Sequence, residues 1–507
     1  MQSARHPGTS EPALSRFVCR VLRSLVIGTC LGGLVLVAGA DASVPVPTLT
    51  GPISSPGAAF ITPPSRLDLT AAGYVEEEFF VEGTARAYST AGAFLSDGRW
   101  PAVPASSAQY KTRILVRRPT SPRTFNGVVI VEWLNVSGGV DAAPDWTFAH
   151  TLLIRKGYAW VGVSAQFVGV EGGSSPLGLD LSLKAVNPAR YGSLSHPGDS
   201  FSYDMFSQVG EAIRNPGGAV PFGPLRARRV IAIGESQSAG RLVTYVNAVH
   251  PLARVYDGFL IHSRGGGGAP LSQSPQATIG TPSPSLVRND LDEPVLIFET
   301  ETDLITLGYF PARQPDGGNV RTWEVAGTAH DDAYGLAVGP DDPGPAAMDT
   351  SYLPPVTSIF GVFTCAKPIN AGPQHYVLSA ALDRLTTWVK KGRIRGRSAP
   401  RLDVVAGPPS SIMRDARGNA VGGIRTPQLD VPIATLSGLG QPAGGFCAIF
   451  GTSVPFDAAT LSTLYPSHTG YVTAVMKAAG EAVRARHLLR ADTPAIRAAA
   501  MASDIGR

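Results

Sequence analysis

The feature that most constrains the fold is the stretch 230–240, which reads Val-Ile-Ala-Ile-Gly-Glu-Ser-Gln-Ser-Ala-Gly. Its first four residues are apolar and mostly β-branched, which predicts a short buried strand. A Gly-x-Ser-x-Ser turn follows, and residues 241–249 then carry apolar side chains at helical spacing. A strand, a tight turn and a helix form the context of a nucleophile elbow. Ser236, at the centre of the turn, is therefore the predicted nucleophile.

The residues that flank Ser236 are small enough for such a turn. Gly234 lies two residues before it and Ser238 two residues after it, where the usual motif has glycine. Ser236 would then lie at a helix N-terminus, where backbone amides and the helix dipole favour developing negative charge. The alternative is a serine-rich surface turn without a catalytic role.

His330 is the predicted base for this serine. A serine hydroxyl is a weak nucleophile until a base takes its proton, and a third group must orient that base. Residues 320–325 predict a strand, and His330 follows its end among small residues. Because a neutral imidazole must accept the proton, activity should fall in acid, near the ordinary histidine range of about pH 6 to 7. Three other histidines are competitors for the role: His196, His262 and His375.

The predicted acid follows another strand, at residues 294–298. In hydrolases of this plan the chain order is serine, acid, histidine. Asp303 fits that order and the usual distance past its strand, whereas Glu301 lies two residues earlier and is the alternative acid. The carboxyl ends of parallel strands meet at one edge of the sheet, which is where sites form in open α/β sheets.

A second loop is expected to help hold an oxyanion. Residues 128–131 are a continuous apolar run, typical of a central parallel strand. The loop after such a strand supplies one amide, and the residue after the nucleophile supplies the other. The predicted donors are therefore the amide of Gln237 and one amide near Asn135 or Val136. The tripeptide 135–137 also matches a glycosylation sequon, but a loop that lines a buried site cannot carry a glycan.

Strand and helix patterns alternate along most of the chain. Further strands are predicted at 74–85, 110–118, 158–163 and 258–261, and an amphipathic helix at 376–391. Such interleaving predicts an α/β fold with a mostly parallel central sheet and helices on both faces. The chain contains 57 Gly and 43 Pro, which predicts long loop insertions, among them 164–201 and 265–285. We expect one domain over residues 43–507, with about 392–507 as a packed C-terminal extension.

The first 42 residues predict a signal peptide. Four arginines precede an apolar stretch at 25–37, and Ala40-Asp41-Ala42 fits a cleavage site. The mature chain would begin at Ser43 and be periplasmic or secreted. The alternative is an uncleaved N-terminal anchor. No later stretch is apolar and long enough to predict a stable membrane span after cleavage.

Cysteine usage agrees with export. After removal of the predicted signal peptide only Cys365 and Cys447 remain. An even pair in an oxidising compartment indicates a disulfide, and two free buried thiols are the alternative.

Charge and motifs exclude other classes of partner. The net charge is +4, and no basic run follows the N-terminal segment, so we expect no nucleic-acid partner. Acidic pairs at 331–332 and 341–342 offer oxygen ligands, but no His/Cys spacing for zinc is present. We therefore predict neither a metal nor a cofactor.

At these motifs the chain resembles serine hydrolases with the α/β-hydrolase fold, and most closely the exported bacterial "alpha/beta hydrolase domain-containing protein" group. The resemblance covers nearly all of the mature chain. It implies the fold and a Ser-His-acid hydrolase, but it implies little about the substrate. The matching motifs are Phe125-Asn126-Gly127, Val131-Glu132-Trp133-Leu134-Asn135-Val136, His196-Pro197-Gly198-Asp199, Tyr203-Asp204, Gly234-Glu235-Ser236-Gln237-Ser238-Ala239, Glu301-Thr302-Asp303, Trp323-Glu324-Val325-Ala326-Gly327-Thr328-Ala329-His330, Pro368-Ile369-Asn370 and Leu464-Tyr465-Pro466-Ser467-His468.

Together these features predict an exported serine hydrolase that cleaves carboxylic esters through an acyl-enzyme. Its substrate would be a small-molecule or lipid-like ester. The same triad would also serve an amidase, a peptidase or an acyltransferase. A hypothesis of another class is a non-catalytic binding protein of the cell envelope built on this fold.

Overall fold

The structure is a computed structural model. The residues that it describes are 43–64, 66–173, 175, 178–344, 347–359, 361, 363–393 and 398–507. The predicted signal peptide, residues 1–42, lies outside them.

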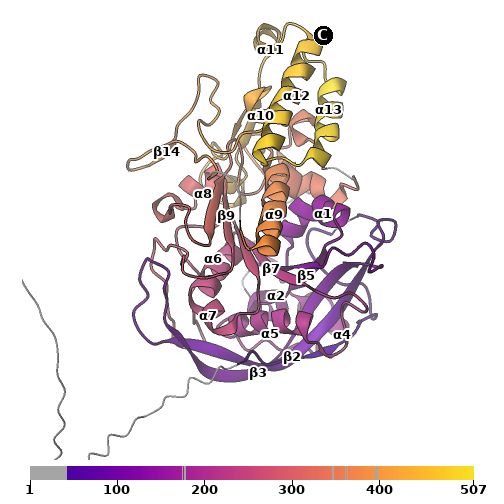
Figure 1. The fold of residues 1–507 in the computed structure, drawn as a ribbon, viewed down its shortest axis with the longest axis vertical. Helices are drawn as coiled ribbons and strands as arrows, with labels where there is room; N and C mark the ends of the chain where they lie inside the picture. The colour runs from indigo at the N-terminus through magenta and orange to yellow at the C-terminus, as the bar shows by residue number, and fades with distance from the viewer. Residues whose placement is uncertain are drawn as a thin grey trace, which may run out of the picture. The chain divides into compact units, whose positions relative to one another are not determined.

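A ten-stranded sheet organises the described chain (Figure 1), in the order β10-β9-β8-β7-β4-β5-β3-β2-β1-β6. Its central part is parallel throughout. Apolar side chains cover both faces of this part, which explains the continuous apolar runs in the sequence. The prediction of a mostly parallel central sheet is confirmed. The parallel strands are β4 (Val128–Trp133), β5 (Ala159–Val163), β7 (Arg229–Glu235), β8 (Gly258–His262), β9 (Val295–Glu299) and β10 (Val320–Glu324).

The remaining strands extend one side of the sheet. β2 (Tyr74–Thr90) and β3 (Ala102–Pro119) pair antiparallel over most of their length, and β3 pairs antiparallel with β5. Both are longer than the sequence predicted. The short strands β1 (Thr48–Thr50) and β6 (Gly217–Gly218) complete the edge.

Helices cover both faces of the sheet, as predicted. Alternate residues of β4 show the division: Val129 joins one apolar cluster and Ile130 the other. The Val129 cluster includes side chains of α5 (Ser202–Arg214) and α6 (Gln237–Thr244). The Ile130 cluster includes side chains of α1 (Pro144–Arg155) and α9 (Gln374–Lys391). Each face of the sheet therefore has its own core.

The C-terminal part adds two helices, which the sequence at 471–487 and 494–501 predicts, and a hairpin that was not predicted. Side chains of α12 (His468–Ala485) and α13 (Thr493–Ala502) join the same apolar cluster as α9. These two helices lie together in Figure 1. The hairpin consists of β15 (Ala434–Ser437) and β16 (Thr452–Pro455), which pair antiparallel.

The other elements are short. They are α2 (Phe167–Glu171), α3 (Leu183–Val186), α4 (Pro188–Tyr191), η1 (Tyr245–Val249), α7 (His250–Ala253), α8 (Glu301–Ile305), η2 (Phe310–Ala312), η3 (Tyr334–Val338), η4 (Gly339–Asp341), η5 (Thr350–Tyr352), β11 (Ser358–Ile359), β12 (Phe363–Thr364), β13 (Val404–Val405), β14 (Ser411–Ile412), α10 (Pro427–Asp430), η6 (Phe446–Ile449), α11 (Ala458–Leu464) and η7 (Arg490–Asp492).

A disulfide joins Cys365 to Cys447, with an Sγ–Sγ distance of 2.03 Å. The predicted pairing is confirmed. It links the segment after β12 to η6, which belongs to the connection between the hairpin strands. Among the described residues, no helix has the length and apolar character needed to cross a membrane.

Candidate active site

The predicted elbow is present at the end of β7. Ser236 has φ 60° and ψ −120°, a strained conformation for a residue with a side chain. A Cβ added at Gly234 would lie 3.2 Å from Ser238 and Leu242, which explains the glycine. The amide of Ser236 donates to the carbonyl of His262 at 2.9 Å and so ties the turn to β8. The turn leaves Ser236 partly exposed beside the first residue of α6.

Ser236, His330 and Asp303 lie in hydrogen-bond contact. The Nε2 atom of His330 is 2.7 Å from the Oγ atom of Ser236. The Nδ1 atom of His330 is 2.7 Å from the Oδ1 atom of Asp303. If Nδ1–H donates to Asp303, a neutral imidazole presents its lone pair at Nε2 to the serine hydroxyl. The geometry therefore allows His330 to take the proton of Ser236.

The start of α8 fixes Asp303. The backbone N–H and the hydroxyl of Thr300 both donate to Oδ2 of Asp303, at 2.6 and 2.7 Å. Burial alone would raise the pKa of Asp303, but the charge of His330 and the hydrogen bonds from His330 and Thr300 lower it below the ordinary value. Asp303 is therefore held as a carboxylate that faces the imidazole.

Glu301, the alternative acid, has other partners. Its carboxylate accepts hydrogen bonds from the amides of Gly327 at 2.6 Å and Gly438 at 3.1 Å. It also forms a salt bridge with Arg414 at 2.8 Å. Glu301 is wrong as the alternative partner of His330, because its side chain connects the histidine loop to the β15–β16 hairpin.

The backbone amides of Gln237 and Val136, both predicted oxyanion donors, have no hydrogen-bond acceptor in the described part of the chain. Gln237 is the first residue of α6, where an amide has no acceptor within the helix. Asn135 is wrong as an amide donor, because its N–H already donates to the carbonyl of Ala142 at 2.9 Å.

Asn135 acts through its side chain instead. Its Nδ2 atom donates to the backbone carbonyl of Glu235 at 3.2 Å. Ser238 donates from its hydroxyl to the carbonyl of Leu134, also at 3.2 Å. These two bonds hold the loop after β4 against the elbow.

Sequence reasoning missed Glu235, the residue directly before the nucleophile. Its Oε1 atom lies 3.1 Å from Nε2 of His330, and its Oε2 atom accepts from Nδ2 of Asn135 at 3.0 Å. Burial raises the pKa of Glu235 to about 8. The only signal in the sequence is an acidic residue inside the Gly-x-Ser motif.

The electrostatic surroundings of His330 change the expected pH range. Burial alone would lower the pKa of His330, but the carboxylates of Glu235 and Asp303 outweigh it and raise the pKa to about 9. Burial also raises the pKa of the neighbouring Asp331 to about 6. These carboxylates therefore predict that His330 titrates above the ordinary histidine range of about pH 6 to 7.

The three competing histidines have structural partners. His262 contacts Asp145 at 2.9 Å, and burial lowers the pKa of His262 to about 4. His375 stacks on Tyr334 with ring centroids 3.9 Å apart. The ring of His196 bonds the carbonyl of Ala165 at 3.0 Å. Within the described residues, no group of three His, Cys, Asp or Glu side chains is placed to hold a metal ion.

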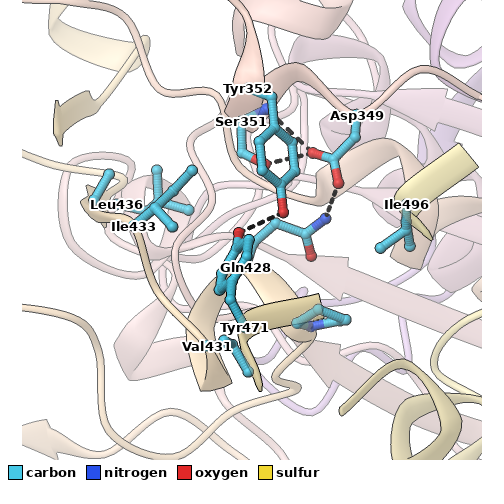
Figure 2. Close-up of a pocket in the computed structure, with 11 residues that line it drawn as sticks. Asp349, Ser351, Tyr352, Gln428, Val431, Ile433, Leu436, Tyr471 and Ile496 are labelled. Atoms are coloured by element: carbon cyan, nitrogen blue, oxygen red, sulfur yellow. Dashed lines mark hydrogen bonds between the residues drawn. The ribbon is translucent and has the colours of Figure 1, made fainter. Parts of the chain in front are cut away.

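A pocket near the C-terminal helices contains none of the predicted site residues (Figure 2). Its polar groups bond one another: Gln428 donates to Asp349 at 2.8 Å, and the hydroxyls of Tyr352 and Tyr471 are 2.6 Å apart. Its volume is about 10 Å³, which is room for one water molecule. This pocket is a packed junction rather than a candidate reaction site.

The match to a protein family agrees with this architecture. Residues 42–498 match the family model described as "Alpha/beta hydrolase domain". No curated protein matches the chain. The matching solved structures are distant in sequence. An α/β serine hydrolase without lid from Xanthomonas campestris is 12% identical with a TM-score of 0.26, and the match covers 48% of this chain and 86% of that chain. A fungal esterase from Rhizomucor miehei is 11% identical with a TM-score of 0.25, and the match covers 51% of this chain and 82% of that chain. A glucuronoyl esterase from Solibacter usitatus is 11% identical with a TM-score of 0.28, and the match covers 55% of this chain and 83% of that chain.

The family match and the architecture lead to the same assignment. The parallel sheet, the helices on both faces and the elbow after β7 are features of the α/β-hydrolase fold. The match spans most of the sequence, from residue 42 to residue 498, and the chain belongs to the alpha/beta hydrolase domain family.

Proposed function

We propose that the protein is a serine hydrolase that cleaves carboxylic esters through an acyl-enzyme. One observation carries the proposal. The Oγ atom of Ser236 lies 2.7 Å from Nε2 of His330, whose other ring nitrogen is bound by Asp303. This is the arrangement in which a base activates a serine and a carboxylate orients the base.

The proposed reaction has two halves. The Oγ atom of Ser236 attacks the ester carbonyl carbon while Nε2 of His330 takes the hydroxyl proton. His330 then gives this proton to the alcohol oxygen as the carbon–oxygen bond breaks, which leaves an acyl group on Ser236. Water attacks the acyl group with His330 again as the base, and the acid departs. The amides of Gln237 and Val136 are proposed to bind the oxyanion, an interaction worth several kcal/mol per donor.

The experiment is a substrate screen with the mature protein. It uses p-nitrophenyl acyl esters of graded chain length, with p-nitroanilides of the same acyl groups as amide controls. The proposal expects ester turnover that Ser236→Ala abolishes. Faster turnover of the anilides would indicate an amidase, and acyl transfer to an added alcohol in preference to water would indicate an acyltransferase.

The non-catalytic alternative predicts a different result in the same screen. A binding protein on this fold would neither turn over esters nor react with a fluorophosphonate probe. Ser238 does not offer a second nucleophile of this kind, because it is fully buried and its hydroxyl donates to Leu134. Labelling that survives Ser236→Ala would therefore contradict the proposed site.

Export is a separate part of the proposal. A disulfide between Cys365 and Cys447 is typical of oxidising compartments, and the N-terminal sequence fits a cleaved signal. We expect the native protein in the periplasm or the medium, with Ser43 as its first residue. Recovery of an N-terminus upstream of residue 40 from cells with active signal peptidase would contradict cleavage.

A further inference from the structure

We propose that Glu235 is a fourth catalytic residue, whose carboxyl group shares one proton with Nε2 of His330, the same atom that takes the proton of Ser236. This inference rests on the proposed function, since it assigns a role to a residue of the same site. It adds a group that the Ser-His-Asp arrangement does not include.

Two side chains compete for one ring nitrogen. Nε2 of His330 is 2.7 Å from Oγ of Ser236 and 3.1 Å from Oε1 of Glu235. Because Nδ1–H is directed at Asp303, a neutral imidazole has a single lone pair, at Nε2. A protonated Glu235 would donate to that lone pair, and an ionised Glu235 would accept the N–H of the imidazolium. In both states the lone pair is withheld from the serine.

Glu235 is fixed in this position. It is the last residue of β7, so the strained turn that exposes Ser236 also sets the direction of the Glu235 side chain. Asn135 binds both the carboxylate and the backbone carbonyl of Glu235. The side chain is 7% exposed, and within the described residues no Lys or Arg forms a salt bridge with it. The imidazolium of His330 is thus the cationic partner of this carboxylate.

The titratable groups around the pair come from every neighbouring element. Glu235 interacts with His330, with His262 at the end of β8, with Asp331 and with Asp145 on α1. His330 interacts with Glu235, Asp303 and Asp331. Carboxylates dominate this set, and they favour a proton on the Glu235–His330 pair. The pKa values of Glu235 and His330 are both raised, which is the direction expected when the pair holds a proton into the alkaline range.

The arrangement has two effects on the reaction. Below the alkaline range the shared proton keeps His330 from acting as a base. Above it, the ionised Glu235 stabilises the imidazolium that forms in each half of the reaction, in the manner of the triad carboxylate. Removal of the carboxylate should therefore let the enzyme work at lower pH and lower its maximal rate.

The test is a titration of His330 that needs no substrate. The imidazole is followed by proton NMR from pH 5 to 10 in the full mature chain, and the His330 signal is assigned by its loss in His330→Gln. In Glu235→Gln we expect the pKa of His330 to fall by at least one unit. The pH profile of the fluorophosphonate labelling rate should change with it. The acid limb of this profile should move to lower pH by the same amount, and the plateau should be reduced.

Two further variants serve as matched controls. Glu235→Asp keeps a negative charge at the same backbone position and should keep most of the elevation in the His330 pKa. Asp331→Asn removes a neighbouring carboxylate that does not contact Nε2, and its effect should be less than half that of Glu235→Gln. If Glu235→Gln does not fold, as judged by its near-ultraviolet circular dichroism, Glu235→Ala replaces it.

Three outcomes would overturn this proposal, and a fourth would overturn the proposed function. A His330 pKa that is the same in the wild type and in Glu235→Gln would overturn the proposal, and so would an equal shift in Asp331→Asn. A lower pKa with an unmoved acid limb of labelling would also overturn it. Activity that persists in Ser236→Ala would instead overturn the proposed function, since the NMR titration of His330 does not depend on turnover.

Discussion

Asp303 and Glu301 lie two residues apart at the start of α8, yet their carboxylates face different partners. Asp303 bonds the ring of His330, whereas Glu301 bonds the amides of Gly327 and Gly438. The helical turn at α8 separates the two side chains, although residues two apart would share a face in an extended chain. Substitution of Asp303 should therefore lower activity, whereas substitution of Glu301 should lower stability.

The substitution Asp303→Asn should lower kcat by about 10³ to 10⁴, because the imidazole loses its orienting carboxylate and its correct tautomer. The protein should stay folded, since asparagine keeps the volume and one oxygen. Steady-state kinetics on the preferred p-nitrophenyl ester measure the loss. A loss below tenfold in a folded variant would show that another group orients His330.

The substitution Glu301→Gln should act on stability. Glu301 is fully buried and paired with Arg414, so it is not the solvated carboxylate that its loop position suggests. Hydrogen bonds to a charged group contribute about 1.5 to 3 kcal/mol, so the loss of the Glu301 charge should lower the unfolding free energy by about that amount, measured by denaturant titration. Glu481→Gln, an exposed Glu on α12, is the control and should change stability by less than about 0.5 kcal/mol. Equal unfolding free energies in the two variants would contradict the role given to Glu301.

Wild-type activity should rise through the alkaline range. The raised pKa of His330, about 9, means that the imidazole stays protonated where an ordinary histidine is already neutral. Below that value kcat/KM should fall about tenfold per pH unit, because the fraction of neutral His330 falls in that proportion. The pH profile of kcat/KM between pH 6 and 10 measures this. A plateau already reached at pH 7.5 would show that His330 titrates as an ordinary histidine.

At the scale of the elements, the histidine loop is supported by the β15–β16 hairpin. Thr302 bonds the carbonyl of Gly438, and Asn370 bonds Gly327 and Ser437. The disulfide between Cys365 and Cys447 fastens the connection of this hairpin to the segment before α9. The C-terminal part of the chain therefore supports the loop that carries His330.

Loss of the disulfide should destabilise the protein. Cys365 and Cys447 are 82 residues apart, and closing a loop of this length contributes about 4 kcal/mol or less in the chain-entropy model. Cys447→Ser and Cys365→Ser should lower Tm by similar amounts, because each removes the same bond. Mass spectrometry without reductant should find one linked peptide. If both thiols are alkylated under those conditions, the bond is absent from the native protein.

Local pattern was enough to predict the centre of the sheet. Apolar runs located β4, β7 and β9 because strands buried on both faces leave little room for other residue types. The hairpin β15–β16 escaped prediction because its strands are short and half exposed. β3 was cut short because its first residues are mostly exposed and include Pro104, Ser106 and Ser107.

In the whole molecule, some residues of the candidate site can be predicted from local sequence pattern, whereas others depend on the tertiary fold. Ser236, Asp303 and His330 could be predicted because each follows a strand at the same edge of the sheet. Glu235 could not, because its contact with His330 depends on side-chain direction at a strained turn. The amide of Asn135 was wrongly assigned, because its bond to Ala142 depends on how the loop after β4 folds back.

Covalent labelling of Ser236 tests the central claim most directly. The mature protein is treated with a fluorophosphonate at pH 9, digested, and its adduct located by peptide mass spectrometry. We expect one adduct per chain on the peptide that contains Ser236, no adduct in Ser236→Ala, and strongly slowed labelling in His330→Gln. An adduct on another residue, or labelling that is unchanged in Ser236→Ala, would contradict this expectation.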